Sequence, residues 1–130
     1  MIYTLLVLAS PISGSSARSA VHFVRAAIAR GHQVNRVFFL DEGADSGNAN
    51  AVFPQDENDL TELWRELAIQ HNVELVLCVS SALKRGMLDS TEASRYEKPA
   101  STIFDEFEIS GLGQLIDAAG TADRLLTFGG

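Results

Sequence analysis

The chain has 130 residues, a mass of 14.0 kDa and a formal net charge of −7, from 17 acidic and 10 basic side chains. With 46% hydrophobic and 21% charged residues, its composition is that of a folded globular protein, and we expect a single domain over residues 1–130. The acidic balance argues against direct binding of DNA or RNA, which requires a basic surface.

The start of the chain lacks the features of a secretion signal. Its apolar run, residues 5–9, is too short, and no positive charge precedes it. No stretch approaches the ~20 apolar residues needed to cross a bilayer. The single cysteine, Cys78, cannot form an internal disulfide, and no group of side chains has the spacing of a metal site. We therefore expect a cytoplasmic protein with no membrane contact, metal or cofactor.

The first two predicted elements are a strand and a helix. Residues 1–9 form a continuous apolar run, which is typical of a strand covered on both faces. Ser15 or Ser16 is a candidate N-cap for a helix over residues 17–30, which carries an apolar stripe with helical spacing. Gly31 is suited to the left-handed position that ends such a helix.

A second strand is predicted over residues 33–40, and residues 41–55 are predicted to form a loop because they are rich in Gly, Asn and Asp. Asp56 or Asn58 is expected to open the next helix. Helical spacing then defines the buried face of this helix, which contains Leu60, Leu63, Trp64, Leu67 and Ala68.

The C-terminal half repeats the alternation. Residues 73–79 predict a buried strand, and residues 80–98 a short helix followed by irregular or weakly helical chain. Residues 107–110 predict a brief strand, 111–120 a helix, and 122–128 the last strand. Strands that alternate with helices indicate an α/β fold, a three-layer α/β/α domain with a mainly parallel sheet of about five strands.

Cys78 lies near the end of the third predicted strand, just before Ser80 and Ser81. Open parallel sheets place their sites at the carboxyl ends of strands. If Ser80 caps the next helix, the helix dipole favours a thiolate, and Lys84 and Arg85 add positive charge within two turns. A free cysteine is also often buried and packs as a small hydrophobe. From the residues alone, both a packing role and a reactive role stay open.

Other polar segments are interpreted as structural. His22, His32 and His71 are scattered, and two of them precede strands at the opposite end of the sheet from Cys78, so we interpret them as surface or packing residues. Neither "SGSS" nor "SGLG" has the glycine pattern or the lysine of a nucleotide-binding loop. We interpret them as a helix cap and a tight strand-to-helix turn.

Several blocks along the chain occur together in a recognisable order: "ARGHQVNRVFFLDEG", "PQDENDL", "LCVSSALKRGMLDSTEASR" and "ISGLGQLIDAAGTADRLLTF". Over nearly the full length they resemble the DsrE/TusD family of small sulfurtransferase subunits. In that family the block CV-x-x-A-x-x-RG carries the reactive cysteine. Its positions here are Cys78, Val79, Ala82, Arg85 and Gly86.

The resemblance implies a persulfide carrier that accepts sulfane sulfur on Cys78 and passes it to a partner's cysteine. TusD-like proteins receive sulfur from a TusA-like donor and pass it to a TusE-like acceptor, in the synthesis of 2-thiouridine at the tRNA wobble position. DsrE-like proteins pass it to a DsrC-like acceptor in sulfur oxidation. Both types imply a heterohexamer with two related subunits, TusB/TusC-like or DsrH/DsrF-like, and no metal or organic cofactor. The wide occurrence of tRNA thiolation, not the site residues, favours the first pathway.

The resemblance also implies roles near the thiol. Backbone N–H groups around Ser80 and Ser81 would stabilise the thiolate, and Lys84 and Arg85 would assist, although Arg85 could instead pair with an acidic neighbour. Two other interpretations stay open. One is a non-catalytic scaffold subunit, against which the presence of Cys78 argues. The other is a nucleotide- or flavin-binding domain, which the doubly wound layout permits by analogy only.

Overall fold

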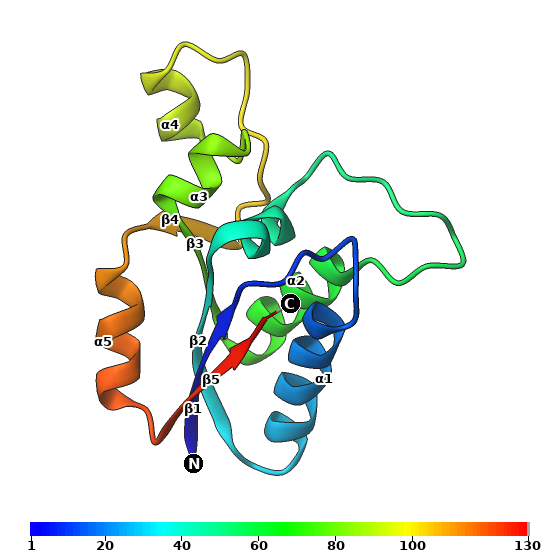
Figure 1. Cartoon of the computed structure of the whole chain (residues 1–130), viewed down its shortest axis with the longest axis vertical. Coiled ribbons are helices and arrows are strands. Elements are labelled where there is room, and N and C mark those ends of the chain that lie inside the picture. Colours follow the sequence, from blue (N-terminus) through cyan, green and yellow to red (C-terminus); the bar gives the residue numbers. More distant parts are fainter. Residues whose placement is uncertain (130) are drawn as a thin grey trace.

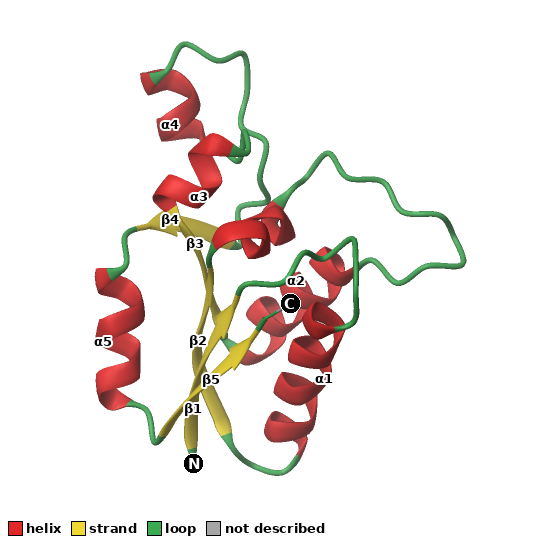
Figure 2. Ribbon diagram, viewed as in Figure 1, coloured by secondary structure: helices red, strands yellow, loops and turns green. Residues whose placement is uncertain are grey.

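The computed structural model describes residues 1–129 and is built around one five-stranded sheet of order β4-β3-β2-β1-β5 (Figures 1 and 2). All four neighbouring pairs are parallel, so the carboxyl ends of all strands lie along one edge of the sheet. The strands are β1 (Ile2–Val7), β2 (Gln33–Phe39), β3 (Glu74–Cys78), β4 (Phe107–Ser110) and β5 (Arg124–Phe128).

Helices cover both faces of this sheet. Figure 1 shows α1 (Ser16–Ala29) and α2 (Leu60–His71) on one face and α5 (Gly113–Thr121) on the other. The predicted three-layer α/β/α arrangement and the parallel sheet are therefore confirmed. Within residues 1–129, none of the helices has the length and apolar character needed to cross a membrane.

The two faces of the sheet bury cores of different size. The larger core lies under α1 and α2, where the edge of the Trp64 ring meets the Phe39 ring at a centroid distance of 5.3 Å. The smaller core lies under α5 and contains Phe38, Val76 and Cys78. The aromatic side chains of Trp64, Phe39 and Phe38 are all fully buried. Each contributes roughly 2–3 kcal/mol from burial of its apolar surface.

Two helix starts differ from the prediction. The second helix begins at Leu60, because Asp59 accepts a hydrogen bond from the backbone N–H of Glu62 at 3.2 Å and so caps the helix. At α1 the predicted N-cap position is confirmed, because Ser15 occupies it, but the Ser15 side chain makes no cap hydrogen bond. The Ser16 hydroxyl instead donates to the carbonyl of Gly129, beyond the end of β5. Tertiary contact has therefore replaced the local cap.

Residues 41–55 are only partly a loop, because Asp41–Gly47 form a 3₁₀ helix, η1, at the carboxyl edge of the sheet. A Cβ at Gly43 would lie 2.1 Å from the carbonyl oxygen of Val7, so only glycine lets η1 lie against the end of β1. The glycines that favour a loop in the sequence thus serve close packing.

The chain beyond β3 also departs from the prediction. Helix α3 (Val79–Lys84) starts directly after the strand, with Cys78 itself at the N-cap position, so the expected cap at Ser80 is wrong. The segment expected to be irregular or weakly helical contains one short, defined helix, α4 (Ser90–Arg95), which Asp89 caps by accepting a hydrogen bond from the backbone N–H of Glu92 at 2.8 Å. Both short helices lie beyond the carboxyl edge of the sheet (Figure 2).

Candidate active site

Cys78 stands at the junction of β3 and α3. It is the last residue of the strand, its backbone is extended, and the next residue is helical. Alternate strand residues face the same side of a sheet, so Cys78 shares with Val76 the face that α5 covers. The side chain is 3% exposed, and it is the one cysteine of the chain. Strand and helix together therefore fix a single thiol at the carboxyl edge.

The first turn of α3 surrounds the thiol with hydrogen-bonding groups. The Sγ atom of Cys78 lies 3.4 Å from the Oγ atom of Ser80. Burial raises the pKa of the Cys78 thiol, but hydrogen bonds from the side chains and backbone N–H groups of Ser80 and Ser81 lower it. The net pKa of Cys78 lies below its ordinary value, because these donors stabilise the thiolate more than burial disfavours it.

Ser81 connects this turn to the rest of the carboxyl edge. Its side chain is buried, and its Oγ atom accepts a hydrogen bond from the backbone N–H of Asp41 at 2.9 Å. A hydroxyl has one donor and two acceptor sites, so the bond from Asp41 leaves the Ser81 proton free to point at Cys78. Helix η1 thereby orients a donor toward the thiol.

The basic residues of α3 lie farther along the helix. Lys84 is its last residue, and Arg85 turns back so that its guanidinium donates to the Ser81 carbonyl at 3.2 Å. Neither charge is among the groups that shift the pKa of Cys78. The structure thus brings Ser80 and Ser81 to the thiol, and it places Lys84 and Arg85 toward the other end of the helix.

From the sequence, Arg85 could pair with a nearby carboxylate, either Asp89 or Glu92, but it pairs with neither. Within the described residues its side chain makes no ion pair with Asp89 or Glu92, and Glu92 pairs with Arg95 at 3.0 Å. Arg85 instead influences Asp45 of η1. Burial raises the pKa of the Asp45 carboxyl, and the Arg85 charge partly offsets that increase. The sequence does not mark Asp45 for this position, because nothing in "DEGAD" distinguishes it from its acidic neighbours.

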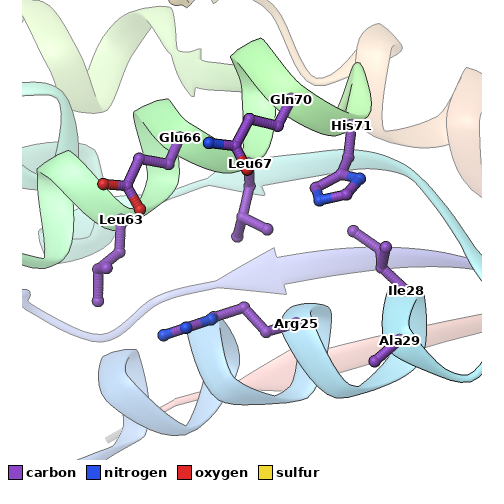
Figure 3. Close-up of a pocket in the computed structure, with 8 residues that line it drawn as sticks. All are labelled: Arg25, Ile28, Ala29, Leu63, Glu66, Leu67, Gln70 and His71. Atoms are coloured by element: carbon purple, nitrogen blue, oxygen red, sulfur yellow. The ribbon is translucent and has the colours of Figure 1, made fainter.

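The histidines lie away from Cys78. His22 is exposed on α1, and the Nδ1 atom of His32 lies 3.0 Å from the N-terminal nitrogen of Met1, at the amino edge of the sheet. His71 ends α2 and lines a pocket of about 320 Å³ between α1 and α2 (Figure 3). Within residues 1–129, no cluster of His, Cys, Asp or Glu side chains could hold a metal ion.

The pocket in Figure 3 lies on the helix layer that covers the other face of the sheet from Cys78. Arg25 from α1 and Glu66 from α2 line it together with apolar side chains from both helices. None of its lining residues contacts the thiol, and we do not assign it to the chemistry of Cys78.

The sequence is similar to one known family over nearly its whole length. The model of the DsrE/DsrF-like family matches residues 1–128. A sulfurtransferase TusD homolog from Pseudomonas aeruginosa is 45% identical over 125 residues, which cover 96% of this chain and 95% of that protein. A sulfurtransferase TusD from Salmonella typhi is 39% identical, over 98% of this chain and 100% of that one.

Two further comparisons extend the likeness. The DsrE protein from Allochromatium vinosum is 41% identical over 129 residues, with 99% of both chains covered. The crystal structure of the ychN protein from E. coli superimposes with a TM-score of 0.76 at 21% identity, over 98% of this chain and all of that one. At this identity the superposition shows a shared fold.

Proposed function

The chain belongs to the DsrE/DsrF-like family and is a sulfurtransferase, and from this premise we propose that Cys78 carries the transferred sulfur as a persulfide. One observation carries the proposal: the single thiol of the chain lies at the carboxyl edge of the sheet, in a helix turn whose donors lower its pKa. A thiolate is the nucleophilic form of cysteine, so this placement favours reaction over simple packing.

The proposed reaction has two thiol-exchange steps. The Cys78 thiolate attacks the outer sulfur of a donor persulfide. A new S–S bond forms on Cys78, the donor's S–S bond breaks, and the donor leaves as a thiolate. An acceptor thiolate then attacks the outer sulfur on Cys78, takes it as its own persulfide, and releases the Cys78 thiolate. The sulfane sulfur moves without net oxidation, so one cysteine per protein and no cofactor suffice.

The surroundings of Cys78 suit both anions in this cycle. The thiolate before loading and the persulfide anion after it each accept hydrogen bonds from the first turn of α3, through the hydroxyls and N–H groups of Ser80 and Ser81. The low exposure of Cys78 also restricts access. A partner must therefore present its sulfur on a narrow segment that reaches the carboxyl edge.

We further propose that the chain works in a relay complex. The likeness to relatives named sulfurtransferase TusD supports the TusD-like branch of the proposal. In that branch the chain would take sulfur from a TusA-like donor and pass it to a TusE-like acceptor, for 2-thiouridine at the tRNA wobble position, within a heterohexamer with TusB/TusC-like subunits. The net charge of −7 fits a carrier in the cytoplasm that hands sulfur to proteins and does not itself contact tRNA.

The second candidate function is a step in sulfur oxidation, with DsrH/DsrF-like subunits and a DsrC-like acceptor. The specific observation in its favour is the 41% identity to the DsrE protein from Allochromatium vinosum, close to the 45% found for a TusD homolog. Measurement of tRNA 2-thiouridine in cells that lack this chain distinguishes the two: loss supports the tRNA pathway, and an unchanged level supports sulfur oxidation.

The central experiment loads the purified protein with a persulfide donor and measures its intact mass. We expect the wild type to gain one sulfur atom that a thiol reductant removes, and Cys78→Ser to gain none. Ser19→Ala, a change on the exposed surface of α1, is the control and should load like the wild type. Equal loading of Cys78→Ser would contradict the proposal.

A further inference from the structure

A groove of about 560 Å³ lies between the two short helices beyond the carboxyl edge. Its lining is largely apolar, with Leu88 buried and Tyr96 half exposed. The groove is lined by Leu83, Lys84, Gly86, Leu88, Tyr96 and Lys98. Exposed apolar surface bordered by charge is typical of a binding site for a protein segment.

The charged side chains that line the groove are both positive. The chain has two lysines, Lys84 and Lys98, and both line this groove, although the protein carries a net charge of −7. Both side chains are exposed, and within residues 1–129 neither forms an ion pair. The groove therefore combines an apolar floor with two free positive charges, which complement an acidic and partly apolar partner.

The groove is also held in shape before any partner binds. Helix α3 ends at Lys84 and is closed by Gly86, whose φ is +74° and which lets the backbone N–H of Met87 donate to the Ala82 carbonyl at 2.8 Å. The chain after α4 is pinned as well, because Leu88 and Thr102 exchange two hydrogen bonds of 2.8 Å. A preformed groove avoids the entropic cost of ordering itself on binding.

One face of α3 leads from the thiol to this groove. Ser80, whose hydroxyl contacts Cys78, and Lys84 are four residues apart, so they lie on the same face about one helical turn, 5.4 Å, apart. A partner segment of a few extended residues, at about 3.3 Å per residue, can therefore occupy the groove while its sulfur reaches Cys78.

We propose that the α3–α4 groove docks an acidic protein segment with an apolar anchoring side chain, from the protein that exchanges sulfur with Cys78. The identity of the partner rests on the proposed function, whereas the docking of an acidic segment rests on the groove alone. The lysines steer the acidic segment to the groove, and the apolar floor holds its anchor. Nucleic acid fits the groove less well, because binding through phosphates draws on several basic contacts and only two basic side chains line the groove.

The test measures docking apart from sulfur chemistry. Isotope-labelled protein is titrated with a synthetic acidic peptide that carries a central Phe-Leu pair among Asp and Glu residues, and with a matched peptide in which those acids are Asn and Gln. We expect the acidic peptide to shift the NMR signals of Leu83, Leu88 and Tyr96, and the neutral peptide to bind about tenfold more weakly.

The variant Lys84→Glu/Lys98→Glu should weaken binding of the acidic peptide by about tenfold or more. The matched control, Arg18→Glu/Arg30→Glu, makes the same change in charge at exposed positions of α1 and should bind like the wild type. An NMR spectrum of each variant verifies its fold. Absence of binding, equal binding of both peptides, or shifts confined to the α1–α2 pocket of Figure 3 would overturn the proposal.

Two added measurements complete the test. With Cys78 loaded, transfer to an acidic cysteine peptide should be slowed about tenfold in the lysine variant, while transfer to neutral 2-mercaptoethanol stays unchanged. Equal slowing of both would overturn the proposal. If Cys78 does not load, the proposed function fails, and the peptide titration still decides the docking. A short oligonucleotide that displaces the acidic peptide would show a nucleic-acid site instead and also overturn it.

Discussion

The Sγ atom of Cys78 lies 3.4 Å from the Oγ atom of Ser80, two residues later in the first turn of α3. The Ser80 hydroxyl is one of the donors that hold the pKa of the thiol below its ordinary value despite burial. Because strand β3 ends at Cys78 without an intervening loop, this distance is set by the strand-to-helix junction itself.

Replacement of Ser80 by alanine should raise the pKa of Cys78, because the thiolate loses a hydrogen bond and burial is unchanged. At neutral pH a smaller fraction of the thiol is then ionised, and alkylation by iodoacetamide should slow by up to about tenfold. The rate measured against pH should move to higher pH. Ser19→Ala on α1 is the control, and a Ser80→Ala profile identical to the wild type would show that the hydroxyl has no such effect.

The same depressed pKa predicts that stability depends on pH. The pKa of Cys78 in the folded state is lowered from the ordinary value of 9.0, which applies to the unfolded chain, so ionisation favours the fold. This contribution is absent below the folded-state pKa, grows as the pH rises through it, and is complete above the unfolded-state value. Relative to Cys78→Ser, the free energy of unfolding of the wild type should therefore increase from neutral pH to about pH 9.

Urea denaturation in the presence of a reductant measures this difference at each pH. The comparison with Cys78→Ser removes the contributions of all other titrating groups, which the two proteins share. If the difference in free energy of unfolding between the wild type and Cys78→Ser stays constant from neutral pH to about pH 9, the thiol has the same pKa in the folded and unfolded states.

Gly43 tests the packing that brings η1 to the site. A Cβ on Gly43 would lie 2.1 Å from the carbonyl oxygen of Val7, a backbone atom that cannot move aside. Gly43→Ala should therefore destabilise the fold by roughly 3 kcal/mol or more and loosen the contact between Asp41 and Ser81. Thermal unfolding measures the loss, and alkylation of Cys78 reports whether its surroundings change.

The matched control is Gly120→Ala. Gly120 lies within α5 and has open space for a Cβ, so alanine should stabilise the fold by about 0.5–1 kcal/mol through its helix propensity. Both changes reduce backbone freedom, but only Gly43→Ala adds a Cβ to a closely packed site. A loss of stability at Gly43 together with a gain at Gly120 would therefore assign the loss to close packing. Similar effects from both would argue against a special role for Gly43.

The sequence predicts those parts of the structure that depend on local patterns. Apolar runs and helical stripes identify the five strands and α1, and their alternation predicts the parallel sheet. The position of Cys78 at a strand end follows from the same pattern. The N-cap of α3 is mispredicted as Ser80, whereas the structure has Cys78. The start of α3 depends on where β3 stops pairing with β4, which is a tertiary property.

The rest of the site depends on residues that are distant in sequence. The bond from Asp41 to Ser81 joins η1 to α3 across 40 positions, and no local signal marks either residue as a partner. Lys84 and Lys98 meet in one groove because a defined helix, α4, forms where the sequence predicts only irregular or weakly helical chain. Periodicity cannot report such contacts, because they arise when separate elements pack together.

Glu97 gives a last prediction, at the end of α4. Its φ is +56°, a left-handed conformation in which a side chain costs energy and glycine does not. The conformation is retained because it allows the backbone N–H of Lys98 to donate to the Ala93 carbonyl at 2.8 Å, closing the helix as at Gly86. Glu97→Gly should therefore stabilise the protein by about 0.5–1 kcal/mol.

Chemical denaturation measures this gain, and Gly86→Ala, at the equivalent position after α3, is the reciprocal change. Gly86 also has a positive φ and open space for a Cβ, so alanine there should destabilise the protein by about 1 kcal/mol through backbone strain alone. Neither substitution touches the serine donors, so the pH profile of Cys78 alkylation should stay unchanged in both variants. A loss of stability in Glu97→Gly would mean that the Glu97 side chain contributes more than its backbone strain costs.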